Sequence, residues 1–369
     1  MRNKVIKTSK FFIITFCTFI IFDLIIGNYV YKKILKKNFF DIDTHMGEQH
    51  PIYNHGLQKN YNTSSAGWGK RRFEFCTDNY GFRNFCNVNY EKKNFDMGII
   101  GDSQTLGLGL NFKEVFSTII SNELKKKKIA NLAVSSYSPA IYYSKINYLL
   151  ENDFDFKEII VFLDLSDLHD DSTRYKLVGK KVLSKKNVNF FGDENYSFSE
   201  KFMRFLKRRL KVTHHIIFES NNLLIKLNMK EKTIPYWIEN NPRSSWTYNY
   251  DRTWYENKDL DEVINNSLNN MTKLHNLLKQ DNIELSIAVF PWPSILKHDN
   301  PNNLQVKIWR KFCENKCKKF YNFMDPFFEL KKKIGYKNLY FKYFIEGDVH
   351  LNEFGNRLIA DSFLKEYKN

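Results

Sequence analysis

The sequence of 369 residues lacks the patterns by which nucleic-acid-binding proteins are recognised. It holds no helix-turn-helix, zinc finger or RNP motif, and its basic residues are scattered rather than gathered in a stripe. It also lacks internal repeats and low-complexity segments, and 43% of its residues are hydrophobic, so general disorder is not expected. Nucleic acid is therefore not an expected partner, although the formal net charge is +16. A basic surface that faces an anionic glycan or lipid headgroups fits this charge better.

Cysteine is scarce, with five residues in the whole chain. Cys17 lies in an apolar run near the amino terminus, and the other four are Cys76, Cys86, Cys313 and Cys317. An even number outside that run permits disulfides in an oxidising compartment, and three connectivities are possible. The last two cysteines have no nearby histidine, so we expect no metal site there.

The amino terminus has the pattern of a signal anchor. Residues 1–10 are basic, and residues 11–27 (FFIITFCTFIIFDLIIG) form an apolar run of about the length that spans a bilayer. No small-x-small cleavage site follows, which favours an uncleaved anchor over a removed signal peptide. Asp23 and the lysines after the run argue against this, and a buried amino-terminal helix is the alternative. We expect a single-pass anchor with the main domain outside the cytoplasm.

The remaining chain divides by pattern. Residues 28–95 are polar and rich in tyrosine and asparagine, which indicates an extended juxtamembrane region that packs on the main domain, residues 96–369. In the main domain, predicted strands at 97–100, 129–134 and 158–165 alternate with predicted helices. This alternation favours right-handed βαβ crossovers and a parallel sheet.

An insertion at about 175–262 interrupts this alternation. It holds a basic, amphipathic stretch and an aromatic segment with several tryptophans. We interpret it as a lid or as a helix that contacts a membrane, with an ordinary packed helix as the alternative. The strand and helix pattern then resumes and ends in a carboxyl-terminal helix.

Polar residues follow the predicted strands where each one ends. Gly101-Asp102-Ser103 follows the first strand, Asn131 to Ser136 end the second, and Asp164 to Asp167 end the third. The chain closes with residues 348–355 (DVHLNEFG) before its final helix. Because the ends of parallel strands share one edge of the sheet, we expect these groups to converge.

The chemistry that these residues favour is nucleophilic catalysis. A serine hydroxyl needs an adjacent base, so Ser103 is the expected nucleophile and His350 the expected base. Asp348 would orient the imidazole and stabilise its charged form. Backbone amides at Ser103 and Ser136, with the side chain of Ser166, would form an oxyanion hole. This chemistry needs no metal ion and no organic cofactor.

These segments resemble the conserved blocks of the SGNH (GDSL-like) hydrolase superfamily. The resemblance rests on Gly-Asp-Ser after a strand and on a closing D-x-H-x-N-x-x-G before a helix, over about 96–170 and 282–366. It implies a flavodoxin-like, three-layer α/β/α sandwich with a parallel sheet, and esterase, lipase or acetyl-transfer activity. The shortened Asp348-Val349-His350 form is similar to the motif of membrane-associated proteins of glycan O-acetylation.

Two blocks depart from the pattern of the family. The usual glycine of the second block falls on Ser136, and the third block, usually G-x-N, reads Asp164-Leu165-Ser166. A shorter hydroxyl thus replaces an asparagine donor, and the loss of one oxyanion donor costs about 3 to 4 kcal/mol. A catalytically inactive glycan-binding or assembly protein with the same fold is therefore one alternative.

Several residues also have simpler interpretations. Asp348 is alternatively a helix cap, and Asp102 is interpreted as a hydrogen-bonding brace of its loop. The acidic stretch at 164–171, with His169, is compatible with a metal site, but we favour an exposed acidic loop. His55 is interpreted as a surface or packing residue.

The leading hypothesis is a membrane-anchored, extracytoplasmic serine hydrolase or acyltransferase. It would act on O-acyl groups of a cell-envelope polysaccharide, with O-acetyl groups favoured. A second hypothesis is a lipid esterase or phospholipase that rests on the membrane through the basic insertion. The expected partners are an acylated polysaccharide or other ester substrate and a membrane, and the sequence indicates no protein partner.

Overall fold

The computed structural model describes residues 2–31, 46–69, 71–185, 198–227, 229–249 and 259–368. The chain divides into two compact units. We call the first the helical unit (Met1–Ile42 and Phe191–Trp237) and the second the main domain (Asp43–Phe190 and Ile238–Asn369).

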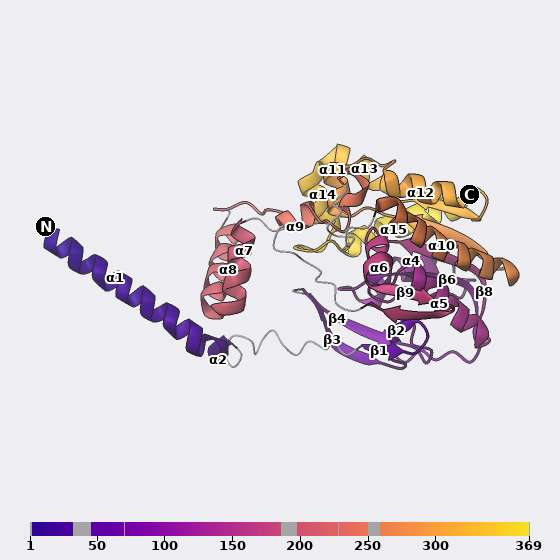
Figure 1. Cartoon of the computed structure of the whole chain (residues 1–369), viewed down its shortest axis with the longest axis horizontal. Helices are drawn as coiled ribbons and strands as arrows, with labels where there is room; N and C mark the ends of the chain where they lie inside the picture. The colour runs from indigo at the N-terminus through magenta and orange to yellow at the C-terminus, as the bar shows by residue number, and fades with distance from the viewer. Residues whose placement is uncertain are drawn as a thin grey trace. The chain divides into compact units, whose positions relative to one another are not determined.

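The main domain is built on an eight-stranded sheet in which five neighbouring strands are parallel (Figure 1). In sheet order, these are β12 (Lys319–Asn322), β11 (Glu284–Val289), β8 (Asp155–Leu163), β6 (Asn94–Gly101) and β7 (Ile129–Asn131). Strands β6, β8 and β11 are rich in isoleucine, valine and phenylalanine and are largely buried, as expected where both faces of a sheet are covered. The predicted α/β class with a mostly parallel sheet is confirmed.

Helices connect the parallel strands and cover both faces of the sheet. The longer ones are α4 (Phe116–Glu123), α5 (Pro139–Glu151), α10 (Leu260–Gln280), α12 (Leu304–Cys313), α13 (Met324–Ile334), α14 (Tyr336–Tyr343) and α15 (Glu353–Tyr367). The chain steps from β6 to β7 in one direction and from β7 to β8 in the other, so right-handed crossovers place α4 and α5 on opposite faces. Helix α15 packs on α4, and α10 packs on α5, which completes the three layers.

Shorter elements join these layers. They are α3 (Ser103–Leu106), η4 (Phe112–Glu114), α6 (Asp167–Thr173), β9 (Tyr175–Val178), β10 (Lys181–Ser184), α9 (Tyr236–Glu239), η6 (Ser245–Thr247) and α11 (Pro293–His298). The predicted insertion at 175–262 therefore begins with the β9–β10 hairpin, and it continues into the helical unit before it returns to the main domain.

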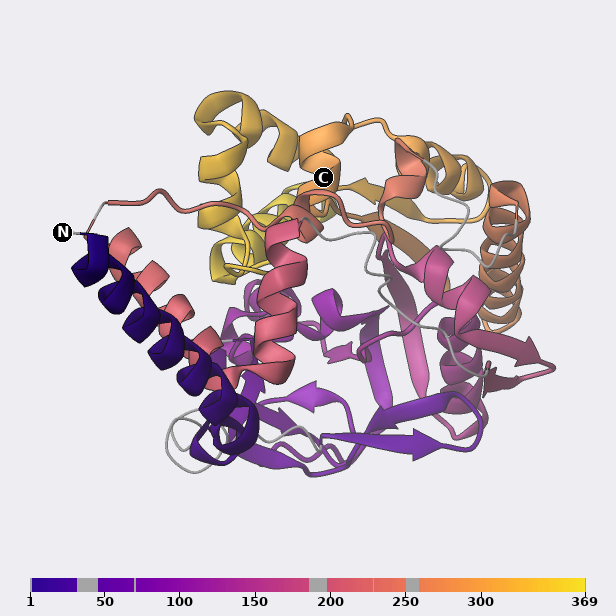
Figure 2. The same ribbon diagram turned by 60° about the vertical axis from the view of Figure 1, so that its left-hand side comes forward.

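Residues 46–84, which we call the strand extension, form five strands. They are β1 (Gly47–His50), β2 (Asn54–Leu57), β3 (Asn62–Trp68), β4 (Arg71–Thr77) and β5 (Arg83–Asn84). Strands β3, β4 and β5 are antiparallel, and β5 joins the large sheet through the pair of Arg83 with Asn131 on β7. Figure 2 shows these strands along one side of the main domain, with α10 to α15 on the other. The chain thus begins its sheet with residues that precede the first parallel strand.

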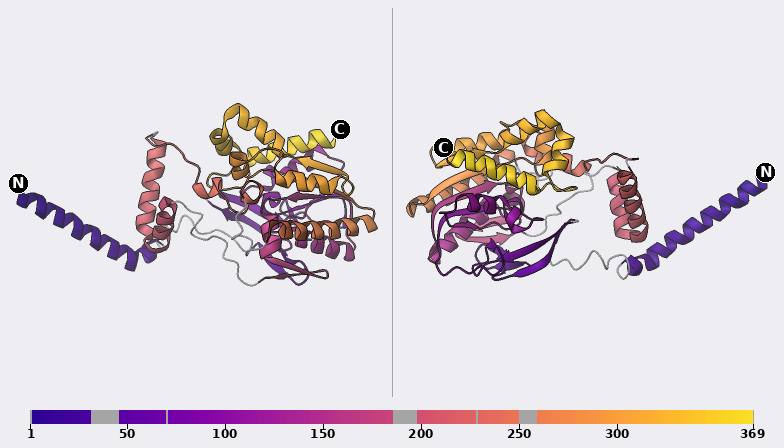
Figure 3. Two further views of the ribbon diagram at one scale, coloured as in Figure 1. Left: turned by 45° about the horizontal axis from the view of Figure 1, so that its top comes forward. Right: turned by 180° about the vertical axis from the view of Figure 1, so that it is seen from behind.

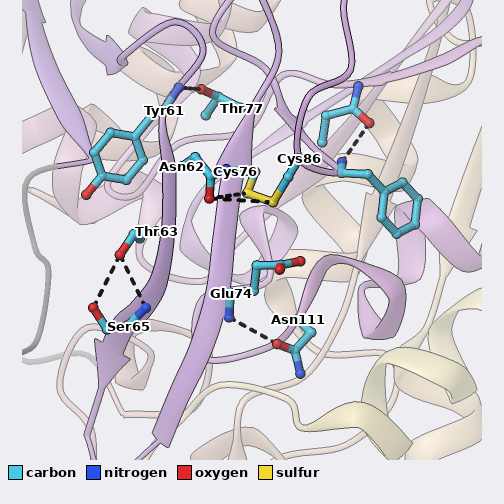
Figure 4. Close-up of a disulfide and its surroundings, with 11 residues drawn as sticks. Tyr61, Asn62, Thr63, Ser65, Glu74, Cys76, Thr77, Cys86 and Asn111 are labelled. Atoms are coloured by element: carbon cyan, nitrogen blue, oxygen red, sulfur yellow. Dashed lines mark hydrogen bonds between the residues drawn. A yellow bond between two sulfur atoms is a disulfide. The ribbon is translucent and has the colours of Figure 1, made fainter.

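Two disulfides lie in the main domain. Cys76 on β4 is bonded to Cys86, which follows β5 (Figure 4), and Cys313 is bonded to Cys317. Of the three connectivities that the sequence allows, the structure contains this one, and Cys17 is a free thiol.

The helical unit contains α1 (Arg2–Phe22), the π-helical turn η1 (Asp23–Gly27), α2 (Asn28–Val30), α7 (Phe198–Arg209) and α8 (Lys211–Lys226). Helix α8 packs beside α7 and against η1 and α2 (Figure 3). The apolar run at 11–27 is divided between α1 and η1, and no helix in the described ranges has the length and apolar character needed to cross a bilayer. The expected membrane-spanning anchor is therefore not confirmed.

Candidate active site

The candidate site lies at the switch point of the parallel sheet. The chain leaves β6 toward β7 on one side and later returns to β8 on the other side of β6, which opens a crevice beyond the carboxyl ends of these strands. Ser103 begins α3 directly after β6. Only glycine fits at position 101, because a Cβ atom there would lie 2.2 Å from Oγ1 of Thr105. The sharp turn from strand to helix therefore presents Ser103 at the edge of the sheet.

The structure brings the three predicted catalytic residues together. The Oγ atom of Ser103 lies 2.9 Å from Nε2 of His350. On the opposite side of the same ring, Nδ1 lies 2.6 Å from Oδ1 of Asp348. The two bonds form one chain from hydroxyl to imidazole to carboxylate, which is the arrangement that allows a histidine to take a proton from serine.

The charges in this chain favour a protonated histidine. Burial alone lowers the pKa of His350, but the carboxylate of Asp348 opposes this effect, and the net result is a pKa above the ordinary value. Burial raises the pKa of Asp348, yet His350 and a hydrogen bond from Trp68 hold it below its usual range. An imidazolium formed when Ser103 loses its proton is therefore stabilised where it forms.

Asp348 is not the cap of the last helix. Asn352 has that role, since its Oδ1 accepts hydrogen bonds from the amides of Phe354 and Gly355 at the start of α15. The alternative interpretation of Asp348 as a helix cap is therefore wrong.

Trp68 and Gln104 hold the catalytic loops in place, and sequence reasoning identified neither. The indole Nε1 of Trp68 donates to Oδ2 of Asp348 at 2.7 Å, and its ring meets the edge of the His350 ring at 5.2 Å between centroids. Gln104 is buried and bridges to the histidine loop, through bonds to the carbonyl of Val349 and the amide of Leu351. The position of Gln104 beside the Gly-Asp-Ser motif was a local signal, whereas Trp68 is 280 residues from its partner.

The two backbone amides that the sequence suggested for an oxyanion hole are, within the described part of the chain, free to donate a hydrogen bond. Among the described residues, neither the amide of Ser103 nor that of Ser136 has a hydrogen-bond acceptor. Ser136 has a φ of +63°, a conformation that favours glycine, so this loop keeps the backbone shape of a glycine position. Donors that are unoccupied and fixed in place stabilise the charge that develops on an acyl oxygen.

His55 supports this loop. It is half-buried, and its Nε2 lies 2.8 Å from the carbonyl oxygen of Ser135, one residue before Ser136. Burial lowers the pKa of His55, so a neutral ring donates this bond. The packing interpretation from sequence described the burial of this residue but overlooked the loop that it holds.

The third predicted oxyanion donor has another partner. Both the amide and the hydroxyl of Ser166 donate to Oδ1 of Asp164, at 2.8 and 2.6 Å. The hydroxyl is buried and engaged with this carboxyl group. The structure therefore does not present the hydroxyl of Ser166 to a substrate, and only the two amides are left of the predicted oxyanion donors.

Three carboxyl groups lie behind the nucleophile. Asp102, Asp164 and Asp167 are buried, and each places a carboxyl oxygen within 4.8 Å of the others. Burial raises the pKa of Asp102 to about 8, and burial also raises those of Asp164 and Asp167. Carboxylates this close in a dry site do not all ionise at neutral pH, so the group shares protons.

Hydrogen-bond donors already occupy several carboxyl oxygens of this group, which leaves few of them free for a metal ion. Asp164 accepts from the indole of Trp292 at 2.7 Å, and Asp167 accepts from the hydroxyl of Tyr142 at 2.9 Å. Asp102 accepts from the amide of Gln104 as the cap of α3, which agrees with its interpretation as a brace. Its second oxygen lies 3.2 Å from Oγ of Ser103, so a protonated Asp102 can donate to the nucleophile.

The acidic stretch at 164–171 is not an exposed loop, as the sequence led us to expect. Most of it belongs to α6, and its four aspartates are at most 1% exposed. Asp170 pairs with Arg243, from the end of the insertion, at 2.8 Å. Asp171 accepts from Ser138 and Asn270. The charges are buried because partners far along the chain neutralise or hydrogen-bond them.

A cavity of about 730 Å³ lies beside the loop that contains Ser135 and Ser136. One wall contains Trp68 and Ser136, and the strand extension and the β9–β10 hairpin supply much of the rest. Its polar and aromatic side chains include Gln49, Asn54, His55, Trp68, Ser135, Ser136, Arg174, Tyr175, Ser184 and Lys185. Leu57, Leu106, Leu108 and Val134 add an apolar surface. The cavity therefore offers an amphipathic chamber beside the oxyanion loop.

Comparisons with known proteins find only distant likenesses to solved structures. No family model and no curated protein sequence matches it. Similar solved structures include the psychrotrophic esterase EstA from Pseudoalteromonas sp. (11% identity, TM-score 0.38, covering 75% of this chain and 97% of that one). Others are a lipolytic G-D-S-L family protein from Veillonella parvula (12%, 0.38, 74% and 99%) and AlinE4, an SGNH-hydrolase family esterase (13%, 0.33, 76% and 96%). Because these identities and TM-scores are low, the likenesses carry no argument about activity.

Proposed function

We propose that this protein is a serine-dependent SGNH-type esterase or acyltransferase. Ser103 is the nucleophile, His350 the general base and Asp348 the carboxylate that orients His350. The observation that carries the proposal is the continuous chain of hydrogen bonds from Ser103 through His350 to Asp348, at 2.9 and 2.6 Å. This chemistry is complete with side chains and backbone amides alone.

The reaction proceeds in two steps. Oγ of Ser103 attacks the acyl carbon while Nε2 of His350 takes its proton, and the amides of Ser103 and Ser136 stabilise the oxyanion. The alcohol leaves with the proton from His350, and the acyl group remains on Ser103. Water, or a hydroxyl of a second alcohol, then gives its proton to His350 and attacks this ester. The bond from the acyl carbon to Oγ of Ser103 breaks, and Oγ takes the proton back from His350, which completes hydrolysis or transfer.

The proposed substrate is an O-acyl group, with O-acetyl favoured, on a cell-envelope polysaccharide. The cavity beside Ser136 supports this choice, because Trp68 and Tyr175 provide flat amphipathic surfaces and its amide and hydroxyl side chains provide hydrogen-bonding groups. Arg174 and Lys185 also line the cavity, together with one acidic residue, Glu48. Because the whole chain is strongly basic, a sugar with an anionic group would be favoured.

The proposed location is the outer side of a membrane, with the amino-terminal helix associated with lipid. Two disulfides support an oxidising compartment. The side chains of Phe11, Phe16, Ile25 and several neighbours are exposed on α1 and η1, which supports association with an apolar phase.

Turnover of matched esters tests this proposal. The full chain in mild detergent is given an acetylated uronate oligosaccharide, an acetylated neutral oligosaccharide of equal length and a phospholipid. We expect acetate release from the oligosaccharides, fastest from the uronate, and none after Ser103→Ala. Ser121→Ala, on helix α4, is the matched control and should keep full activity. Release that survives Ser103→Ala would reject the assigned nucleophile.

A lipid esterase is the second candidate, favoured by the exposed apolar side chains of the helical unit. It predicts the opposite preference, with faster release of fatty acid from phospholipid vesicles than of acetate from either oligosaccharide.

A further inference from the structure

The helical unit carries most of the large apolar side chains that the described part of the chain exposes. Of 25 such side chains, 21 belong to this unit. The much longer main domain has the other four, which are Phe85, Val178, Leu183 and Phe354. Isolated exposed apolar residues are ordinary on a protein surface, but a concentration of this kind marks an interaction surface.

Helices α7 and α8 contribute to this surface independently of the amino-terminal run. On α7, Phe198, Phe202 and Phe205 are exposed at a spacing of four and three residues, which places them on one side of the helix. On α8 and its last turn, Ile216, Leu223 and Leu227 recur at seven and four residues and form a second exposed stripe. Phe198 is 86% exposed and Leu223 is 56% exposed.

The exposed phenylalanines are not the only apolar residues of this region, because two leucines near the end of α7 are covered in the folded chain. Leu206 and Leu210 are buried, and α7 packs on α8. The exposed phenylalanines are therefore additional to the residues that the fold of this helix pair uses. An apolar side chain that folding does not bury costs solubility, unless another phase or partner covers it.

The charge of this helix pair indicates the partner. Between residues 198 and 227 the sequence has seven basic and two acidic residues. Lys207, Arg208 and Arg209 lie in the last turn of α7 and are exposed, and Lys211 follows after one residue. A helix with phenylalanines on one side and clustered lysine and arginine is the pattern that binds the interface of anionic bilayers.

Asp23 removes an obstacle to this arrangement. It lies at the junction of α1 and η1, and a free carboxylate there would oppose contact with lipid. Its side chain is fully buried and accepts hydrogen bonds from the amides of Val212 and Thr213 and from the hydroxyl of Thr213. The carboxylate thus satisfies the first amides of α8, where the helix dipole favours negative charge. The carboxylate within the apolar run is therefore buried and hydrogen-bonded inside the helical unit.

We propose that α7 and α8 form a second membrane contact, which lies in the headgroup region of an anionic bilayer with Phe202, Phe205 and Leu223 directed into lipid. The polybasic turn at 207–209 binds the anionic headgroups. This contact does not depend on the proposed catalytic activity.

Depth-dependent quenching on the full chain tests this contact. In a Cys17→Ser background, single substitutions Phe202→Cys, Leu223→Cys and Phe354→Cys carry an environment-sensitive fluorophore, and vesicles contain phosphatidylcholine with or without phosphatidylglycerol. We expect a blue shift and strong quenching by bromine-labelled lipid at positions 202 and 223. The control at 354, which is exposed to a similar extent in the main domain, should give a water-like signal.

Charge variants test the choice of lipid. The triple variant Lys207→Gln, Arg208→Gln, Arg209→Gln should reduce quenching at position 202 about tenfold in phosphatidylglycerol vesicles, since each basic residue near such a surface contributes to binding. The control is the same change at Lys331, Lys332 and Lys333, the basic last turn of α13, and should have no effect. A water-like signal at 202 and 223 while the protein sediments with vesicles would overturn the proposal. A blue shift without vesicles that grows with protein concentration would also overturn it, in favour of self-association.

Discussion

The carboxyl ends of the parallel strands and the strand extension both contribute to the candidate site, but they contribute different things. The strand ends supply Ser103 after β6 and the amide of Ser136 after β7, while His350 and Asp348 come from the loop before α15. The extension supplies His55 and Trp68, which hold reactive groups in position. The strand ends therefore place Ser103 and the amide of Ser136, and the strand extension holds neighbouring groups in position.

A third residue of the strand extension also holds a loop beside the nucleophile in position. Arg83, on β5, is fully buried and donates hydrogen bonds to the carbonyl groups of Leu106, Gly107 and Leu110. These carbonyls belong to the loop that follows α3 and the nucleophile. The comparison teaches that residues outside the resemblance to the family can be as necessary to the site as those within it.

The largest effect should follow from the removal of the orienting carboxylate. Asp348→Asn keeps the shape of the side chain but no longer fixes the tautomer of His350 or stabilises its charged form. A loss of about 10⁴-fold in kcat on an acetyl ester is expected, with little change in KM. Thermal unfolding is measured alongside, and a variant that keeps its fold and more than a tenth of native kcat would contradict the role of Asp348.

A smaller effect should follow when the extension loses its contact with the same carboxylate. Trp68→Phe keeps the ring but removes the indole N–H that donates to Asp348. A hydrogen bond to a charged group is worth about 1.5 to 3 kcal/mol, so we expect a decrease of about 10- to 150-fold in kcat. The acid limb of the pH profile should also move, because Trp68 helps to keep the pKa of Asp348 low.

The matched control for this change is Trp309→Phe. Trp309 is buried on α12, and within the described residues its Nε1 has no hydrogen-bond acceptor. The control should lose no activity. If both variants lose activity equally, Trp68 acts through packing, and its hydrogen bond to Asp348 does not have the proposed role.

The smallest effect at neutral pH should follow Asp102→Asn. The carboxamide resembles a protonated carboxyl group and can donate to Oγ of Ser103, so kcat at pH 7 should stay within about threefold of the native value. In the native chain, activity should decline as pH rises through about 8, where Asp102 ionises beside the nucleophile, and the variant should lack this decline.

Asp102→Asn should also change how the free energy of unfolding depends on pH. The pKa of Asp102 is about 8 in the folded chain and about 3.9 when unfolded, so the folded state binds more protons between these values. Native stability therefore falls as pH rises from about 4 to 8, and Asp102→Asn should flatten this dependence. Asp155→Asn, at an exposed position on β8, is the control. An unchanged slope in the Asp102 variant would contradict the shared protons.

The sequence was sufficient to predict that Ser103, His350 and Asp348 meet, because each lies in a local pattern. Gly101-Asp102-Ser103 follows a strand, whose carboxyl end lies at the edge of the sheet where sites of such folds form. Asp348-Val349-His350 precedes the last helix. The fold class followed from the same alternation of strands and helices.

The supporting residues were not readable in this way because their roles depend on distant pairing. Trp68 reaches Asp348 only because β3, β4 and β5 extend the sheet beyond β7. The charges of α6 looked exposed because their partner Arg243 is 73 residues from Asp170. Ser166 was expected at the oxyanion, but the burial of Asp164 beside it requires its hydroxyl as a donor.

Covalent trapping tests the central claim most directly. The native chain is treated with a fluorophosphonate, and the modified peptide is identified by mass spectrometry. The predicted result is a single adduct on Ser103 that forms far more slowly after His350→Ala. A folded chain that acquires no adduct, or that is modified at another serine at the same rate in both proteins, would contradict the assignment.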